Sequence, residues 1–162
     1  MDTFTTIKRR RSVRSFTGDP IPISDLEKIV DAGRLAPTGS NRQPWDFIVV
    51  TQKDIIQQLS IAGAWSVDAG AMIIVVMDPS SKYWIEDGSA AVENILLAAT
   101  ALGYGSCWLQ GNAKPHEAEF KHLLKIPDHL KLLTLIPIGV PVAWPGDKQK
   151  KTLEEVIHWE TF

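Results

Sequence analysis

The sequence predicts an α/β or α+β sandwich, a fold in which helices cover the faces of a central sheet. Candidate strands and candidate helices alternate along all 162 residues, and no repeat, low-complexity tract or linker divides them. This length is typical of one domain, which we expect to span residues 1–162. Hydrophobic residues make up 44% of the chain and include six tryptophans, enough for a core without disulfides or metals.

Three helices and two strands are predicted in the first half of the chain. The helix over 23–37 has the clearest boundaries, because Ser24 and Glu27 form a capping-box pattern and Pro37 ends the apolar periodicity. Runs of β-branched and apolar residues predict the two strands. In chain order, the elements are a short helix over 3–12, the helix over 23–37, a strand over 45–51, a short helix over 54–63 and a strand over 71–77.

Three helices and two strands are also predicted in the second half. The helix over 89–103 is rich in alanine and apolar on nearly every side, and Gly103 is expected to end it. One sheet face cannot bury such a helix, so it is either central to the fold or part of a subunit interface. The other elements are a strand over 106–111, a helix over 116–126, a strand over 130–139 and a helix over 152–159, which opens on a second capping box, Thr152 and Glu155.

Composition and charge argue against several classes of function. The net charge of −2 disfavours bulk electrostatic binding to nucleic acid or to an anionic membrane. The longest apolar run, residues 69–77, is far below the ~20 residues that span a bilayer, and no signal peptide is visible, so we expect a cytoplasmic protein. The single cysteine, Cys107, allows no intrachain disulfide and is expected to be a buried, inert thiol. No His or Cys residues stand at metal-ligand spacing.

A local cluster of positive charge stands near the start of the chain, where residues 9–16 read RRRSVRSF. If the segment is helical, Arg10 and Arg14 share a face, and if it is extended, Arg10, Ser12 and Arg14 share one. Both geometries direct two guanidinium groups to one place, which suits a phosphate. The alternative is a basic helix end that complements the helix dipole. The octapeptide by itself leaves both interpretations open.

Two further segments combine glycine with polar side chains. Residues 36–45, APTGSNRQPW, join a helix to a strand and are constrained by proline near both ends. Gly39 allows a flat ligand to approach the backbone, although an ordinary polar turn would have the same composition. Residues 103–112, GYGSCWLQGN, place a turn at Gln110 and Gly111 after a short strand; either a ligand site or a plain buried strand with glycine turns fits this pattern.

Taken together, the three segments resemble the FMN-dependent nitroreductase family. Their order and spacing match along essentially the whole chain, from RRRSVRSF through SNRQPWDFIVV and AAVENILLAATALGYGSCW to LEEVIHWE. The resemblance implies a homodimer with a central, mostly antiparallel sheet flanked by helices, and with two FMN sites at the subunit interface. Longer members carry a helical insertion over the flavin, whereas the segment between Gly63 and Gly88 is brief here. Trp65, Tyr83 and Trp84 in this segment either line the substrate side or serve the core.

The resemblance also implies roles for individual residues in binding FMN. The N-terminal cluster would hold the phosphate and ribityl end, with Arg14 towards the pyrimidine edge, where negative charge develops on reduction. The loop over 37–43 would lie along the isoalloxazine in the partner subunit's site, the turn at 109–111 would face the ring, and a basic C-terminal segment would reach the phosphate. The cofactor-binding residues expected in this way are Arg10, Arg11, Ser12, Arg14, Pro37, Thr38, Gly39, Asn41, Gln43, Leu109, Gln110, Gly111, Lys148, Lys150 and Lys151.

The activity implied is that of an FMN-dependent oxidoreductase that takes electrons from NADH or NADPH. Nitroaromatics, quinones or similar small acceptors would be reduced by ping-pong hydride transfer through flavin N5, with no catalytic acid or base from the protein. The lack of a GxGxxG motif agrees with a nicotinamide that has no Rossmann site of its own, and neither nucleic acid nor a membrane is expected as a partner. Two alternatives remain: a specialised branch that dehalogenates aromatics or fragments flavin, and a non-enzymatic protein that binds an acidic partner through its basic surface.

Overall fold

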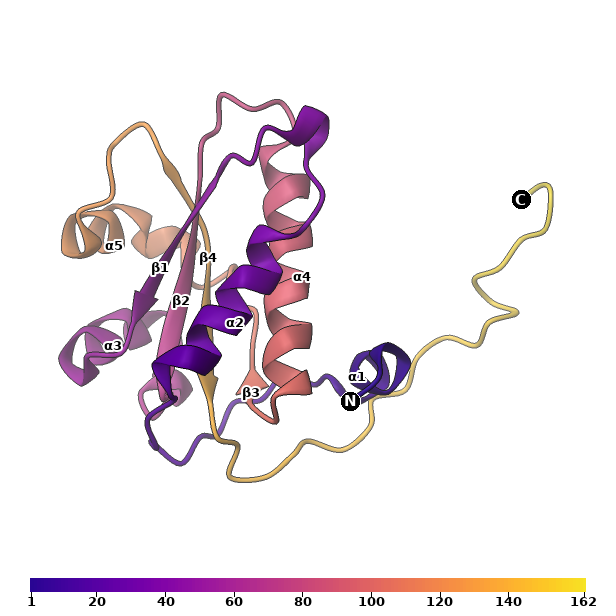
Figure 1. The fold of residues 1–162 in the computed structure, drawn as a ribbon, viewed down its shortest axis with the longest axis horizontal. Helices are drawn as coiled ribbons and strands as arrows, with labels where there is room; N and C mark the ends of the chain where they lie inside the picture. Colours follow the sequence, from indigo (N-terminus) through magenta and orange to yellow (C-terminus); the bar gives the residue numbers. More distant parts are fainter.

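The computed structural model describes all residues, 1–162, and contains a four-stranded sheet flanked by helices on both faces (Figure 1). The strand order is β1-β2-β4-β3, and every neighbouring pair of strands is antiparallel. The expected antiparallel sheet with flanking helices is therefore confirmed. The strands are β1 (Trp45–Val50), β2 (Ala71–Met77), β3 (Gly105–Ser106) and β4 (Lys131–Gly139).

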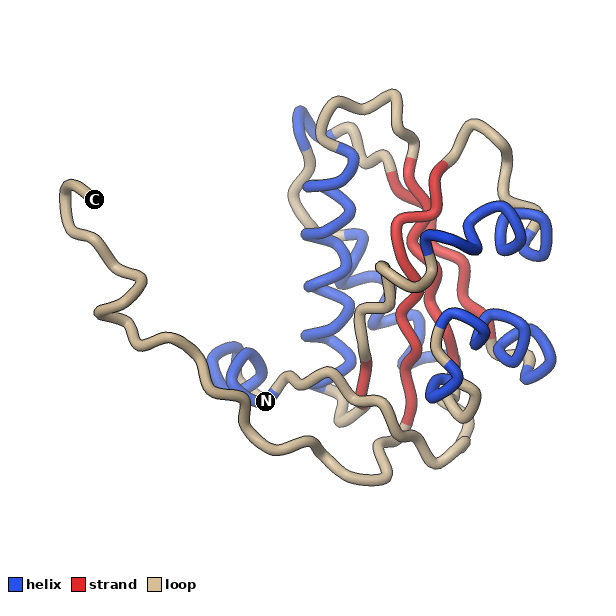
Figure 2. The backbone as a smooth tube through the Cα atoms, turned by 180° about the vertical axis from the view of Figure 1, so that it is seen from behind, coloured by secondary structure: helices blue, strands red, loops and turns tan.

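Different helices cover the two faces of the sheet (Figure 2). The helices α2 and α4 pack against each other and against one face, while α3 and α5 cover the other. The short helix α1 stands apart from both layers, beside the lower end of α4 in Figure 1. The helices are α1 (Thr3–Arg9), α2 (Ile23–Arg34), α3 (Lys53–Leu59), α4 (Trp84–Ala101) and α5 (Glu117–Leu124).

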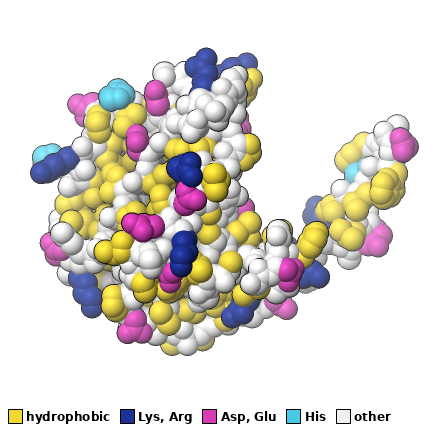
Figure 3. Space-filling view, in the orientation of Figure 1, with side chains coloured by type: hydrophobic (Ala, Val, Ile, Leu, Met, Phe, Trp, Pro, Cys, Tyr) yellow, Lys and Arg dark blue, Asp and Glu magenta, His cyan; other side chains and the backbone are white.

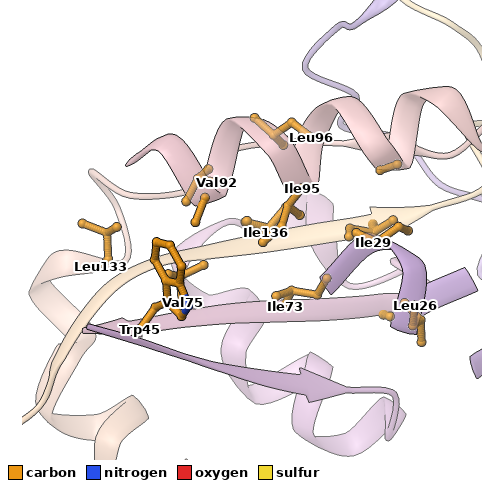
Figure 4. Close-up of a cluster of buried hydrophobic side chains, with 14 of the residues drawn as sticks. Leu26, Ile29, Trp45, Ile73, Val75, Val92, Ile95, Leu96, Leu133 and Ile136 are labelled. Carbon is orange, nitrogen blue, oxygen red and sulfur yellow. The ribbon is translucent and has the colours of Figure 1, made fainter. Parts of the chain in front are cut away.

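The core lies on both sides of β2, which explains why its sequence, AMIIVVM, has no polar residue. Side chains alternate between the two faces of a strand. Ile73 and Val75 therefore pack among the side chains of α2 and α4 (Figure 4), whereas Ile74 and Val76 pack among those of α3 and α5. A strand that is buried on both faces needs a continuous apolar run and not an alternating one.

The helix α4 lies centrally in the fold and begins at Trp84, earlier than the predicted start at residue 89. Its inward side chains, including Val92 and Ile95, pack between α2 and the sheet (Figure 4). The two helices approach closely at Gly33, where an added Cβ would lie only 2.8 Å from the Cγ1 atom of Ile95. The outward side of α4 carries Leu97, which is only half-buried within this chain.

Two predicted helix boundaries are wrong. The first helix ends at Arg9 and not near residue 12, because the chain then turns to extended backbone at Arg10. The capping box of Ser24 and Glu27 does not form. The helix α2 starts at Ile23, as its predicted range does, so Ser24 stands inside the first turn and cannot cap it; the helix ends at Arg34 and not at Pro37.

The strand predicted over 106–111 is much shorter than expected. It pairs with β4 only at Gly105 and Ser106, and again at an isolated bridge between Leu109 and Leu135. Opposite the gap, the carbonyl of Pro137 accepts a hydrogen bond from the N–H of Cys107 at 3.3 Å. Proline has no N–H to donate in return, which interrupts the regular ladder at this position.

The helix predicted over 152–159 does not form, and the C-terminal segment extends away from the body (Figures 1 and 3). One contact of the expected capping box is present, a 2.7 Å hydrogen bond from the Thr152 N–H to the Glu155 carboxylate. An isolated helix this short is marginal in water, and the segment contacts no apolar surface of its own chain that could stabilise it. Among the helices that do form, none combines the length and apolar character needed to cross a membrane.

Candidate functional site

A strongly basic cavity of about 780 Å³ lies between the start of the chain and its C-terminal segment. Six lysine or arginine side chains line it, together with a single carboxylate, that of Asp147. The cavity brings together residues that the sequence suggested for phosphate binding at both ends of the chain: Arg10, Arg11, Ser12, Arg14, Lys148 and Lys150. Lys151, which was also suggested, is not among the lining residues.

Residues 10–14 are extended, which is the second of the two geometries that the sequence allowed. Ser12 forms a parallel bridge with Ser106, and the N–H of Val13 donates to the Ser106 carbonyl at 2.9 Å. Val13 is only 1% exposed, so its side chain points into the protein. Because side chains alternate along extended backbone, Ser12 and Arg14 point to the opposite side, towards the cavity.

Arg10 and Arg14 are each held by one side-chain contact. The Nε atom of Arg10 lies 3.4 Å from the carboxylate of Glu93, which projects from the middle of α4. The guanidinium carbon of Arg14 lies 5.7 Å from the centre of the Trp65 ring, within the range of a cation–π interaction. Both guanidinium groups keep donor atoms available for a ligand, since one such contact cannot occupy all five N–H groups.

Arg11 differs from its neighbours, because its guanidinium is bound to the protein itself. One terminal nitrogen donates to the carbonyls of Lys8 and Arg10, at 2.6 and 2.7 Å. The other donates to the carboxylate of Asp147. These contacts join the end of α1 to the C-terminal segment, so Arg11 shapes the wall of the cavity.

The C-terminal segment is fixed beside the N-terminus by Trp144. Its Nε1–H donates to the carbonyl of Arg9 at 2.9 Å, and the Arg9 guanidinium carbon lies 5.0 Å from the centre of the ring. Two strand-like hydrogen bonds precede it, from the N–H of Val142 to the carbonyl of Ser15 at 3.1 Å and from the N–H of Thr17 to the carbonyl of Val140 at 3.0 Å. This path along the N-terminal residues is what brings the lysines of the C-terminal segment to the cavity.

Cys107 lies next to this cavity and is buried, as predicted. Burial raises the pKa of the Cys107 thiol, and the nearby charge of Arg14, a hydrogen bond to Ser12 and the charge of Arg10 oppose the rise only in part. The thiol therefore stays protonated near neutral pH. A protonated, buried thiol is a poor nucleophile, which agrees with a structural role.

The loop over 37–43 adopts an unusual backbone conformation. Ser40, Asn41 and Gln43 all have φ values between 51° and 54°, in the left-handed region that side chains other than glycine rarely adopt. Each such residue costs roughly 1–3 kcal/mol unless its surroundings enforce the conformation. The Thr38 hydroxyl supplies part of this enforcement by accepting a hydrogen bond from the N–H of Gln43 at 3.2 Å.

This loop is far from the basic cavity within one chain. It lies beside the first turn of α4, whereas residues 10–14 lie towards the other end of that helix (Figure 1). With 18 residues, α4 is about 27 Å long. No residue of the loop over 37–43 lines the basic cavity, so within one chain the two groups of predicted residues do not share a cavity.

The turn at 109–111 continues the sheet edge that starts at the basic cavity. From Ser106 the chain runs along β4 to Leu109, whose N–H donates to the Leu135 carbonyl at 2.9 Å. Gln110 and Gly111 follow and are exposed. Gln110 lines a second, smaller cavity of about 280 Å³ with residues of α4 and β4. Residues 106–111 thus run from the basic cavity to the smaller cavity at Gln110.

Comparison with known proteins identifies the family of this fold. The sequence pattern of the nitroreductase family matches residues 7–72 and 66–140. The chain belongs to the nitroreductase family. An Archaeoglobus fulgidus protein that carries the name NADH dehydrogenase/NAD(P)H nitroreductase is 42% identical over 146 residues, which cover 83% of each chain.

Solved nitroreductase structures share the whole architecture. A Parabacteroides distasonis protein, also named as an NADH dehydrogenase/NAD(P)H nitroreductase, superposes with a TM-score of 0.89 at 31% identity over 96% of each chain. A Clostridium difficile protein described as an FMN-dependent nitroreductase superposes with a TM-score of 0.86 at 28% identity. This match covers 99% of the present chain and 100% of the other, so the two have the same extent.

Sequence reasoning missed the role of Asp87, which holds the loop over 37–43. An acid in the first turn of a helix is usually explained by the helix dipole alone. In the structure Asp87 is only 6% exposed, and its carboxylate accepts a hydrogen bond from the N–H of Gly39. Its other carboxylate oxygen is buried without a partner. Nothing local in the sequence signals this contact, because the two residues meet only in the folded chain.

Proposed function

We propose that this protein is an FMN-dependent NAD(P)H oxidoreductase that reduces nitroaromatics, quinones or similar small acceptors. The observation that carries the proposal is the basic cavity, which gathers Arg10, Ser12 and Arg14 with two lysines from the other end of the chain. Membership of the nitroreductase family, with a similar structure described as FMN-dependent, supplies the identity of the cofactor.

The donor set of the cavity suits the phosphate of FMN. Guanidinium groups form paired, charge-assisted hydrogen bonds to phosphate, and a hydroxyl adds a neutral donor. Lys148 and Lys150 line the cavity and take part in no ion pair, so their charges are available. A volume of about 780 Å³ lies within the range of ordinary cofactor pockets.

The protein is expected to bind and orient, while the redox chemistry belongs to the cofactor. When bound, a flavin would supply ping-pong redox chemistry, taking hydride from NADH or NADPH and giving electrons to the acceptor. The part of this chain is electrostatic. Arg14, which lies within cation–π distance of Trp65, would face the pyrimidine edge and stabilise the negative charge that develops there. No side-chain acid or base is assigned to the reaction.

The complete site requires a second copy of the chain. In one chain the loop over 37–43 lies beside the first turn of α4 and lines no part of the basic cavity, so we infer that the two meet across two chains (Figure 1). In a two-fold homodimer, each surface is used twice and two equivalent sites result. We propose that Pro37, Thr38, Gly39, Asn41 and Gln43 of one subunit face the flavin bound by the other.

Exposed apolar side chains support the same assembly. In the C-terminal segment Leu153 is 68% exposed and Trp159 79%, and on α1 Phe4 is 77% exposed (Figure 3). Large apolar side chains that gather on extended segments mark interaction surfaces. A partner subunit would bury them, together with the outward side of α4.

A visible absorption spectrum of the purified protein, taken without air, tests the proposed function. We expect the bands of oxidised flavin, and we expect them to bleach when NADPH or NADH is added. Replacing Arg10 and Arg14 together by alanine should abolish flavin retention while the far-UV circular dichroism stays unchanged. Arg34→Ala, which removes an exposed guanidinium on α2, is the matched control. A protein that binds no flavin even after incubation with FMN would overturn the proposal.

A further inference from the structure

The smaller cavity beside the Gln110 turn combines an aromatic side chain with two unpaired lysines. It has a volume of about 280 Å³ and lies where the first turns of α4 and α5 meet the start of β4. In Figure 2 the loop that follows β3 runs up between α4 and α5. The lining residues that matter here are Trp84, Gln110, Lys114, Glu117 and Lys131. None of them lines the basic cavity.

The charge of this cavity is positive, and it is not neutralised within the chain. Neither Lys114 nor Lys131 takes part in an ion pair. The single carboxylate present, that of Glu117, accepts a hydrogen bond from the N–H of Leu132 at 3.2 Å. Two ammonium groups beside one engaged carboxylate leave a net attraction for an anion.

An adjoining open cavity extends the same positive surface. It has a volume of about 870 Å³, shares Lys114, Glu117 and Lys131 with the smaller one, and adds further groups of both signs. Lys121 is the least available of these groups, because its ammonium donates to the carbonyls of Asp128 and Leu130, both at 2.8 Å. The other added charged or titratable side chains are His122, Lys125 and Asp128. Lys114 and Lys131 therefore line both cavities and, unlike Lys121, donate no side-chain hydrogen bond within the chain.

We propose that Lys114 and Lys131 bind a negatively charged group, a phosphate or a carboxylate, on a substrate whose reacting part lies at the Gln110 turn. The inference rests on the proposed function and on the family resemblance, which implies that the turn at 109–111 faces the flavin ring. Trp84 offers the flat part of the same substrate an apolar surface. Two substrates could carry the anion: NADPH, through its 2′-phosphate, and an acceptor with a carboxylate.

Measuring the reaction with the nicotinamide and the reaction with the acceptor separately shows which of the two substrates carries the anion. We would replace Lys114 and Lys131 together by glutamine, which keeps the side-chain length similar and removes both charges. If the anion is the 2′-phosphate, kcat/KM should fall at least fivefold for NADPH and less than twofold for NADH. If it belongs to the acceptor, the fall should appear with 4-nitrobenzoate and not with nitrobenzene. Either selective loss supports the proposal and identifies the source.

A matched control carries the same change of charge elsewhere. Lys28→Gln with Lys53→Gln removes two exposed lysines that line neither cavity, and it should leave all four rates within twofold. An equal loss for charged and neutral substrates, or a loss no larger than the control's, would overturn the proposal.

Calorimetry separates failure of this inference from failure of the proposed function. Binding of NADP⁺, NAD⁺ and 4-nitrobenzoate to the purified protein needs no turnover. The wild type should bind NADP⁺ or 4-nitrobenzoate at least fivefold more tightly than the lysine double variant does. The affinity for NAD⁺, which lacks the 2′-phosphate, should be similar in the two proteins. If the protein binds no flavin but still shows this difference in affinity, the proposed function is overturned and the proposed anion site is supported. If the wild type and the lysine double variant bind both anionic probes with equal affinity, the proposed anion site is overturned, whatever the flavin spectrum shows.

Discussion

The carboxylate of Asp87 accepts a hydrogen bond of 3.0 Å from the backbone N–H of Gly39, a residue 48 positions earlier in the chain. The contact joins the first turn of α4 to the strained loop before β1. On the other side of the loop, Gly39 packs so closely on Tyr83 that an added Cβ would lie 2.8 Å from the ring. The first turn of α4 therefore holds the backbone that we propose to face the partner's flavin.

Removing this anchor should loosen the loop. Asp87→Ala leaves the N–H of Gly39 without its partner, which lowers the free energy of unfolding by about 1–3 kcal/mol. We expect a weaker affinity for FMN as well, measured by fluorescence titration. Asp87→Asn keeps an acceptor oxygen and should recover much of the affinity. Glu86→Gln, an exposed acid in the same turn, is the control. Equal affinities in all three variants would show that the anchor does not act on the flavin site.

Neighbouring arginines should give different results when each is replaced. Arg10→Ala removes a donor that lines the basic cavity, so we expect at least a tenfold weaker affinity for FMN and little change in stability. Arg11→Ala removes three hydrogen bonds within the protein, to Lys8, Arg10 and Asp147, so we expect a lower free energy of unfolding. Urea unfolding and flavin titration of both variants check the contrast. Identical profiles for the two variants would contradict it.

The phenol of Tyr104 should make stability depend on alkaline pH. Burial, and then a 2.8 Å hydrogen bond to Asp25, raises the pKa of Tyr104 above its ordinary value near 10. A group whose pKa is raised by folding stabilises the protein below the pKa it has when unfolded. That stability is lost as the pH rises through the folded pKa. We expect the free energy of unfolding to fall more steeply above pH ~10 in the wild type than in Tyr104→Phe, measured in urea.

The C-terminal segment should contribute to dimerisation apart from its role in the basic cavity. Deleting residues 152–162 keeps Lys148 and Lys150 but removes the exposed side chains of Leu153 and Trp159. If a partner subunit buries them, the dimer should dissociate at least tenfold more readily, as sedimentation equilibrium would show. Replacing Glu154 and Glu155 by glutamine, which changes exposed charge and keeps the apolar residues, is the control. An unchanged dimer would place the segment outside the interface.

Much of the fold could be predicted from local patterns. The apolar run of β2, the alternation of helices and strands and the apolar helix before Gly103 are short-range signals, because a strand or helix repeats its burial every few residues. The extended geometry at residues 10–14 was one of two alternatives, and the pairing of Ser12 with Ser106 decided between them. That choice depends on a strand almost a hundred residues away, and so no local pattern carries it.

The sequence by itself determined the family, the layered fold and the residue types of the phosphate site, since these depend on periodicity and on short motifs. Tertiary structure alone decided which of those residues meet. It brought Lys148 to Arg10, tied Asp87 to Gly39 and left residues 152–159 without a helix. It also placed the loop over 37–43 beside the first turn of α4 and outside the basic cavity (Figure 1). The physical reason is the same in each case: local propensity is worth a few tenths of a kcal/mol per residue, whereas burial and pairing between distant segments are worth several times more.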